Sequence, residues 1–135
     1  MSVRLNHTIV WCRDKVRSAD FLTAMLGLPP AKPFLHFLVV ETANGVSLDF
    51  FEKQGSVSTQ HYAFLVEESD FDAIHARLLE RALPYWADPA RQVPGEINRH
   101  DGGRGVYFQD PDGHLLEAIT RPYGSGAAQE EEPAT

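Results

Sequence analysis

The chain has 135 residues, a formal net charge of −7 and a 43% share of hydrophobic residues. This length and composition suit one globular domain with a buried core rather than two independent domains. No basic stripe is present, which argues against nucleic-acid binding, and the single cysteine, Cys12, excludes an internal disulfide framework. The sequence shows no leader pattern and no apolar run of membrane-spanning length, so we expect a cytoplasmic protein that contacts no membrane.

The first half of the chain predicts a strand, a helix and a hairpin in that order. Alternating apolar residues indicate a half-buried strand, with His7 on its apolar face. Asp14 is placed to cap the helix and Gly27 to end it, and the Asn44-Gly45 pair is typical of a hairpin turn. The predicted elements are a strand over residues 3–11, a helix over 15–26 and strands over 36–41 and 46–51.

The second half repeats this order. Ser69 and Asp72 predict the start of a helix whose apolar residues recur at helical spacing. A loop rich in Pro, Gly and Arg follows, and the turn at 110–113 joins the last two strands. The predicted strands cover 61–67, 85–86, 105–109 and 114–120, and residues 124–135 are expected to be a disordered acidic tail. The chain therefore predicts an α+β fold in which a βαβββ pattern occurs twice.

A histidine and an acid occupy matching places in the two halves. His7 and His61 each open a strand, and Asp49 and Glu117 each lie inside a later strand, between large apolar neighbours. Burying such an acid is costly unless a cation meets it. If the halves are related by a pseudo-twofold axis, the four side chains come together, and imidazole with carboxylate suits Fe, Zn, Ni or Mn. One such residue alone is more commonly an ordinary strand residue, but four at equivalent places predict a divalent metal site.

The sequence resembles the vicinal oxygen chelate superfamily, which includes glyoxalase I, extradiol dioxygenases, fosfomycin-resistance enzymes and bleomycin-binding proteins. The resemblance covers nearly all of residues 3–121. It rests on the segments LNHTIVWCRD, SADFLTAMLGL, QHYAFLV and VYFQDPDGHLLEAI, of which the last is the most specific. The resemblance implies one domain over residues 1–123, made of modules at about 3–53 and 59–121 that form a cupped half-barrel around a metal ion.

The resemblance also implies a ligand set. By position, His7, His61 and Glu117 match the three ligands that the family shares, and Asp49 matches the fourth ligand of glyoxalase I, which is usually Glu. Aspartate is one methylene shorter, and a ligating oxygen must come within roughly 2.0–2.2 Å of the ion. Asp49 therefore ligates directly, binds through water, or acts beside the ion as a base. A carboxylate at the ion, Asp49 or Glu117 itself, can move a proton on the substrate.

Three functions remain open at this point. The preferred one is lyase or isomerase chemistry like that of glyoxalase I on a small substrate chelated through neighbouring oxygens. The first alternative is an Fe(II) ring-cleaving dioxygenase of the extradiol type, and the second is a drug-binding protein like the bleomycin-resistance proteins, without turnover. The resemblance further suggests a homodimer, whose modules pair within a chain or between chains.

Four further residues are candidates for contact with the substrate, each with an ordinary alternative. Tyr107 either donates to a substrate oxygen or packs as a strand aromatic. Trp11 lies on the face of His7 and either lines the pocket or belongs to the core. His100 lies in the long loop and either reaches the substrate or is solvated, and Arg104 either binds an anionic group or forms a surface salt bridge.

Overall fold

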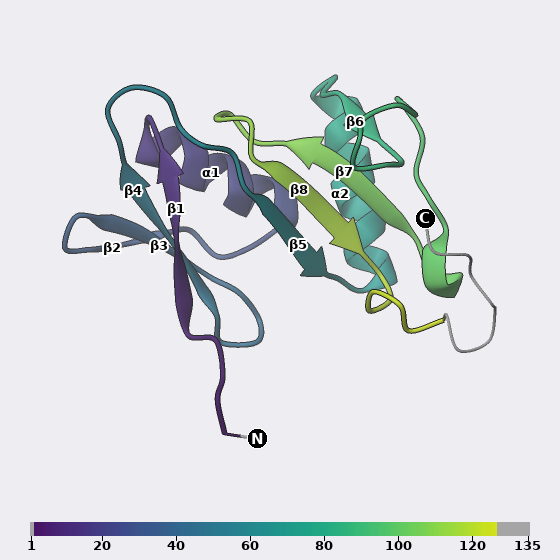
Figure 1. Ribbon diagram of the computed structural model, residues 1–135, viewed down its shortest axis with the longest axis horizontal. Coiled ribbons are helices and arrows are strands. Elements are labelled where there is room, and N and C mark those ends of the chain that lie inside the picture. Colours follow the sequence, from purple (N-terminus) through teal and green to yellow (C-terminus); the bar gives the residue numbers. More distant parts are fainter. Residues whose placement is uncertain (1, 127–135) are drawn as a thin grey trace. The chain divides into compact units, whose positions relative to one another are not determined.

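Two four-stranded sheets, each accompanied by a helix, make up the computed structural model of the protein, which describes residues 2–126 (Figure 1). The chain divides into two compact units. The first contains the residues up to 59 together with 110–113, and the second contains 60–109 and the residues from 114 on. The predicted α+β class with a doubled βαβββ order is confirmed. The single domain over residues 1–123 stays a prediction.

The first unit contains five elements, and its helix begins and ends where the sequence predicts. Asp14 accepts a hydrogen bond from the Arg17 amide at 3.0 Å, and Gly27 ends the helix in the left-handed conformation. The helix buries Ala19, Leu22 and Met25. The sheet has the strand order β1-β4-β3-β2, with β1 parallel to β4. The elements are β1 (His7–Cys12), α1 (Lys15–Leu26), β2 (Lys32–Phe34), β3 (Phe37–Glu41) and β4 (Ser47–Glu52).

The second unit repeats this topology with the strand order β5-β8-β7-β6, and β5 is parallel to β8. The predicted helix start at Ser69 and Asp72 is wrong. Glu67 is the N-cap residue, and its amide donates to the Asp70 carboxylate at 3.1 Å, so the capping box lies two residues earlier. The elements are β5 (His61–Leu65), α2 (Glu68–Glu80), β6 (Tyr85–Trp86), η1 (His100–Gly102), β7 (Gly105–Gln109) and β8 (Leu115–Ile119).

Strand β2 was not predicted from the sequence. It has three residues and contains Pro33, so it is too short for a periodic pattern to reveal it. The first strand is shorter than predicted, because it begins at His7 and leaves Val3 and Leu5 outside the sheet and exposed.

The start of the predicted acidic tail is ordered. The amides of Gly124 and Gly126 donate to the two carboxylate oxygens of Asp101, each at 3.0 Å. The rest of the predicted tail, residues 127–135, lies outside the described residues. None of the helices in the described part of the chain has the length and apolar character needed to cross a bilayer.

Candidate metal and substrate site

Each candidate histidine lies on the face of its sheet that the helix does not cover. In β1, Val10 and Cys12 are buried, whereas His7, Ile9 and Trp11 point to the other side. We call this other side the open face of the first sheet. The same alternation places His61 on the open face of the second sheet, opposite the buried residues of β8.

The two sheets place histidine and acid in the same register. In the first sheet, Asp49 pairs with the residue two positions beyond His7. In the second sheet, Glu117 pairs with the residue two positions beyond His61. Side chains two residues apart on a strand share a face, so each module presents one imidazole and one carboxylate on its open face. The repeat seen in the sequence therefore extends to individual strand pairings.

In the second unit, His61 and Glu117 form a close pair. The His61 Nε2 atom lies 3.1 Å from Glu117 Oε1, and His61 Nδ1 lies 3.0 Å from the Leu115 carbonyl oxygen. A carbonyl oxygen only accepts, so Nδ1 carries the proton and donates it. Nε2 then faces a carboxylate that is only 7% exposed, either donating a second proton to it or turning a lone pair toward it. Two acceptors at this distance repel each other unless a proton or a metal ion joins them.

The donor set fits a divalent metal ion. Two ligand atoms that each lie about 2.0–2.2 Å from one ion, at an angle of about 90–110°, are roughly 2.9–3.5 Å apart. The 3.1 Å between His61 Nε2 and Glu117 Oε1 falls in this range. The hydrogen bond at Nδ1 is the contact that usually orients a metal-binding imidazole. Among residues 2–126, no group of three or more His, Cys, Asp or Glu side chains is placed to hold a metal ion together.

Tyr107 completes this cluster. It pairs with Glu117 across β7 and β8, is buried, and stacks on the His61 ring with 6.0 Å between centroids. Burial raises the pKa of Tyr107, and the hydrogen bond and negative charge of Glu117 raise it further. The phenol therefore stays protonated at neutral pH and above, where it can donate a hydrogen bond.

Replacing Tyr107 by phenylalanine is expected to remove the ionisation that the native protein shows at the highest pH. Because the folded pKa lies above the unfolded value of about 10, the stability linked to this proton is fully present below about pH 10 and is lost as the pH rises further. The ultraviolet absorbance of tyrosinate and the free energy of unfolding, both followed from pH 9 upward, measure this. Identical alkaline curves for native protein and Tyr107→Phe would contradict it.

In the first unit, His7 and Asp49 line one cavity of about 540 Å³ on the open face. His7 Nδ1 donates to the Asn6 Oδ1 atom at 2.8 Å, which leaves Nε2 as the ring nitrogen that could bind a metal ion. Asp49 Oδ1 accepts a hydrogen bond from the Ser47 hydroxyl at 2.9 Å. The volume is in the range of small-molecule sites. Strand alternation places Ser47 on the face of Asp49, two residues away, but the sequence did not predict their hydrogen bond or the contact of Asn6 with His7.

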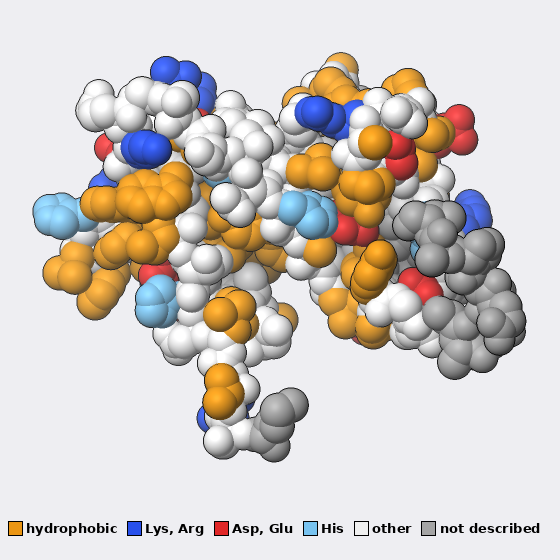
Figure 2. All heavy atoms as spheres, viewed as in Figure 1, with side chains coloured by type: hydrophobic (Ala, Val, Ile, Leu, Met, Phe, Trp, Pro, Cys, Tyr) orange, Lys and Arg blue, Asp and Glu red, His pale blue; other side chains and the backbone are white. Residues whose placement is uncertain are grey.

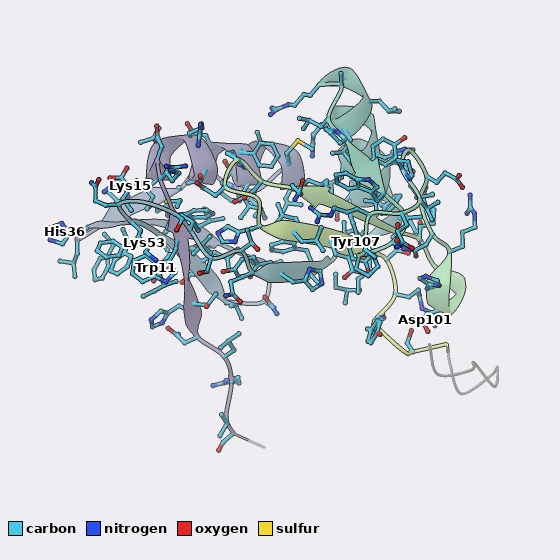
Figure 3. The ribbon with its side chains drawn as sticks, turned by 45° about the horizontal axis from the view of Figure 1, so that its top comes forward. Trp11, Lys15, His36, Lys53, Asp101 and Tyr107 are labelled. Carbon is cyan, nitrogen blue, oxygen red and sulfur yellow. The ribbon has the colours of Figure 1, made fainter. Side chains whose placement is uncertain are left out.

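Trp11 belongs to an aromatic row that crosses the first sheet. Its ring lies 5.3 Å from that of Phe51, which lies 5.0 Å from Phe37, and Phe37 pairs with Phe34 on β2. Trp11 is 39% exposed, so it is not a core residue. Figure 2 shows hydrophobic side chains gathered over this sheet, and Figure 3 labels Trp11 on the first sheet and Tyr107 on the second. The aromatic row and the cavity share Phe34 and Phe37.

Arg104 and His100 lie in different surroundings. Arg104 contacts the carboxylates of Glu68 and Asp72, each at 2.8 Å, and its guanidinium lies 4.5 Å from the centre of the Phe71 ring. Arg104 therefore forms the salt bridge that was the alternative to substrate binding. Its contact with a substrate stays a prediction. His100 begins η1 and is exposed, and its contact with a substrate stays a prediction.

Known proteins resemble this chain closely. Residues 4–118 match the Glyoxalase/Bleomycin resistance protein/Dioxygenase superfamily. The metallothiol transferase FosB of Shouchella clausii (strain KSM-K16) is 40% identical over 86 residues, which are 64% of this chain and 55% of FosB, so the match spans about half of that relative. The glutathione transferase FosA of Serratia marcescens is 30% identical over 84% of this chain and 77% of FosA. The solved structure of oxidase ChaP-H1 is 58% identical, with a TM-score of 0.89 over 91% of this chain and 99% of that one.

Proposed function

Because the chain belongs to the glyoxalase/bleomycin resistance protein/dioxygenase superfamily, we propose that it is a metal-dependent oxidase that acts on an aromatic substrate with neighbouring oxygens. A divalent metal ion is the cofactor of this superfamily, including the FosA and FosB relatives. The relatives with known names are enzymes, which supports catalysis over simple drug binding. We therefore propose oxidation as the reaction, an aromatic compound as the substrate and iron as the metal.

The ligand set supports this choice. The proposed ligands are His7, His61 and Glu117, and we propose that Asp49, which accepts a hydrogen bond from Ser47, acts as a base. Two histidines and one carboxylate leave coordination positions open, and this set is typical of non-haem Fe(II) oxygenases. The lyase or isomerase preference depended on a fourth ligand. The hydrogen bond from Ser47 to Asp49 is compatible with three or four ligands, since ligating carboxylates also accept such bonds. The 58% identity to the oxidase ChaP-H1 makes oxidation the better candidate.

The aromatic row supports an aromatic substrate. Trp11, Phe51 and Phe37 present neighbouring rings, tilted to one another by 54° and 40°, on the open face that carries His7 and Asp49. Aromatic pairs add about 0.5–1.5 kcal/mol beyond the burial of their area, so a flat substrate gains affinity along this row. The oxidase ChaP-H1, at 58% identity, agrees with oxidative chemistry.

The residues of the chain have distinct roles in this proposal. When bound, the metal ion supplies charge that stabilises an oxyanion of the chelated substrate. Asp49 accepts the proton of a substrate hydroxyl, since it lines the cavity together with His7 and its carboxylate is held there by the Ser47 hydroxyl. Tyr107 keeps its proton and donates a hydrogen bond to Glu117, so we assign it the role of positioning that carboxylate. The apolar side chains Ile9 and Val39 flank Asp49 in the cavity lining, since both pair with it across the sheet.

A second candidate rests on the transferase relatives. FosB is named a metallothiol transferase and FosA a glutathione transferase, so group transfer of a thiol is the alternative to oxidation. The two candidates differ in what the protein consumes, which is dioxygen for the oxidase and a thiol for the transferase.

Metal analysis combined with oxygen uptake tests the proposal. We expect protein purified without added metal to contain iron, and to consume dioxygen when it is mixed with 2,3-dihydroxynaphthalene as a probe substrate. The control is the same mixture under argon, which should show no product. The proposal is wrong if the protein contains zinc, nickel or manganese, consumes a thiol and takes up no dioxygen. The transferase would then be the better candidate.

A further inference from the structure

A second cross-strand row runs beside the aromatic row on the open face of the first sheet. Its members are paired directly by the sheet register: Ile9 with Asp49, Asp49 with Val39, and Val39 with Lys32. Neighbouring strands are about 4.8 Å apart, so the backbones at Asp49 and Lys32 are separated by about 10 Å. A negative and a positive residue thus lie in one line, with an aliphatic side chain between them.

Lys32 is an unusual member of the cavity lining. Its nearest lining neighbours along the chain are Pro33 and Phe34, and the ion pairs found among residues 2–126 leave Lys32 out. The fold does not require a cation at this position, since the equivalent residue of the second sheet, paired with Tyr107, is Trp86. Lys32 therefore offers an available positive charge to whatever occupies the cavity.

The negative charges of the lining are Glu41 and Asp49. Both neighbour Ser47, which pairs with His7, and Glu41 also lies two residues from Val39, the partner of Lys32. These carboxylates repel an anionic group unless a metal ion binds it, whereas Lys32 attracts it. Lys32 is thus the one lysine or arginine of the described cavity lining, and the residue there that can receive a carboxylate.

We infer that Lys32 is a specificity-determining residue, and that the substrate is an aromatic acid whose carboxylate binds Lys32 while its neighbouring hydroxyls face His7 and Asp49. The inference deepens the proposed function and rests on its placement of the substrate on the open face. The aromatic row holds the ring system, and the separation of about 10 Å between the charged residues sets its length. No reaction step is involved, because Lys32 acts on binding alone.

Binding of two matched probes tests the role of Lys32. The first probe is 6,7-dihydroxy-2-naphthoate, and the second is the corresponding neutral 6,7-dihydroxy-2-naphthamide, which has nearly the same shape. Affinities for the full chain, as purified and under argon so that no oxidation occurs, are measured by quenching of tryptophan fluorescence. We expect Lys32→Met to weaken binding of the acid about tenfold, as for the loss of one charge-assisted hydrogen bond, and that of the amide less than about twofold.

Two further variants serve as controls. Lys32→Arg keeps the charge and should retain most of the preference for the acid. Lys53→Met changes the net charge equally, but Lys53 follows the end of β4 outside the cavity lining (Figure 3), so both affinities should stay within about twofold. The inference is overturned if Lys32→Met leaves the ratio of the two affinities unchanged, if Lys53→Met alters that ratio as much, or if the unaltered protein binds neither probe. Failure to consume dioxygen would refute the oxidase and leave these binding results standing.

Discussion

Replacing Glu117 by alanine is expected to lower metal affinity by more than about 100-fold and to reduce turnover to background. The substitution removes the one carboxylate proposed to ligate the ion and leaves His61 Nε2 without the oxygen that lies 3.1 Å away. Metal content after dialysis against a weak chelator, together with titration of the metal-free protein, measures the effect. A Glu117→Ala protein that keeps its full metal content would refute the proposed ligand set.

Two substitutions make this result specific. Glu80→Ala removes an exposed glutamate at the end of α2 and should leave metal content unchanged. Asp49→Ala should also retain the ion, because Asp49 is proposed to act beside it, but should lower turnover by about 10²–10⁴-fold, as expected for a lost general base. Loss of the metal in Asp49→Ala would instead show that Asp49 is a fourth ligand. Lyase or isomerase chemistry would then be the better candidate for the function.

Replacing His7 by alanine is the second change for which we expect a large effect. His7 belongs to the first unit, whereas His61 and Glu117 belong to the second. If one ion is held by both modules, His7→Ala lowers metal affinity by about the same factor as His61→Ala. His36→Ala, at an exposed histidine of the first unit, is the matched control. Normal metal affinity in His7→Ala, with a loss in His61→Ala, would confine the site to the second module.

A mixed dimer shows which chain supplies His7. We propose that the protein is a homodimer, so His7→Ala and Glu117→Ala chains with different tags can be co-expressed and the mixed pair isolated. A site built from two chains regains one intact ligand set in the mixed pair, and one metal ion per two chains is then bound. A site built within one chain regains none. Each pure variant, which should bind no ion, is the reference for this measurement.

The repeat was the part of the fold that the sequence could reveal, because it depends on local patterns. Strand alternation placed His7 and Trp11 on one face, and Asp14 and Gly27 marked the ends of α1. Asp49 and Glu117 each pair with the residue two positions beyond the histidine of their own sheet, as that repeat leads one to expect. These features depend on a residue and its near neighbours, which a single sequence contains.

Contacts between distant segments were not accessible in the same way. The sequence could not show that Arg104 contacts Glu68 and Asp72, 36 and 32 positions away, rather than a substrate. Lys32 was missed as a lining residue because a three-residue strand has too few positions to define a face. The capping box of α2 was misplaced for a simpler reason, since glutamate is a rare N-cap residue and Ser69 was the better match by type.

The four residues 110–113 prevent a clean separation of the two modules at one point of the chain. They join β7 to β8 along the chain, yet they belong to the first unit, where Asp112 accepts hydrogen bonds from the Ser18 hydroxyl at 2.7 Å and the Arg13 amide at 3.2 Å. A fragment that stops at residue 59 lacks this carboxylate and leaves the buried Ser18 hydroxyl without it. A fragment of residues 1–59 would therefore need residues 110–113 supplied as a separate peptide to restore these hydrogen bonds.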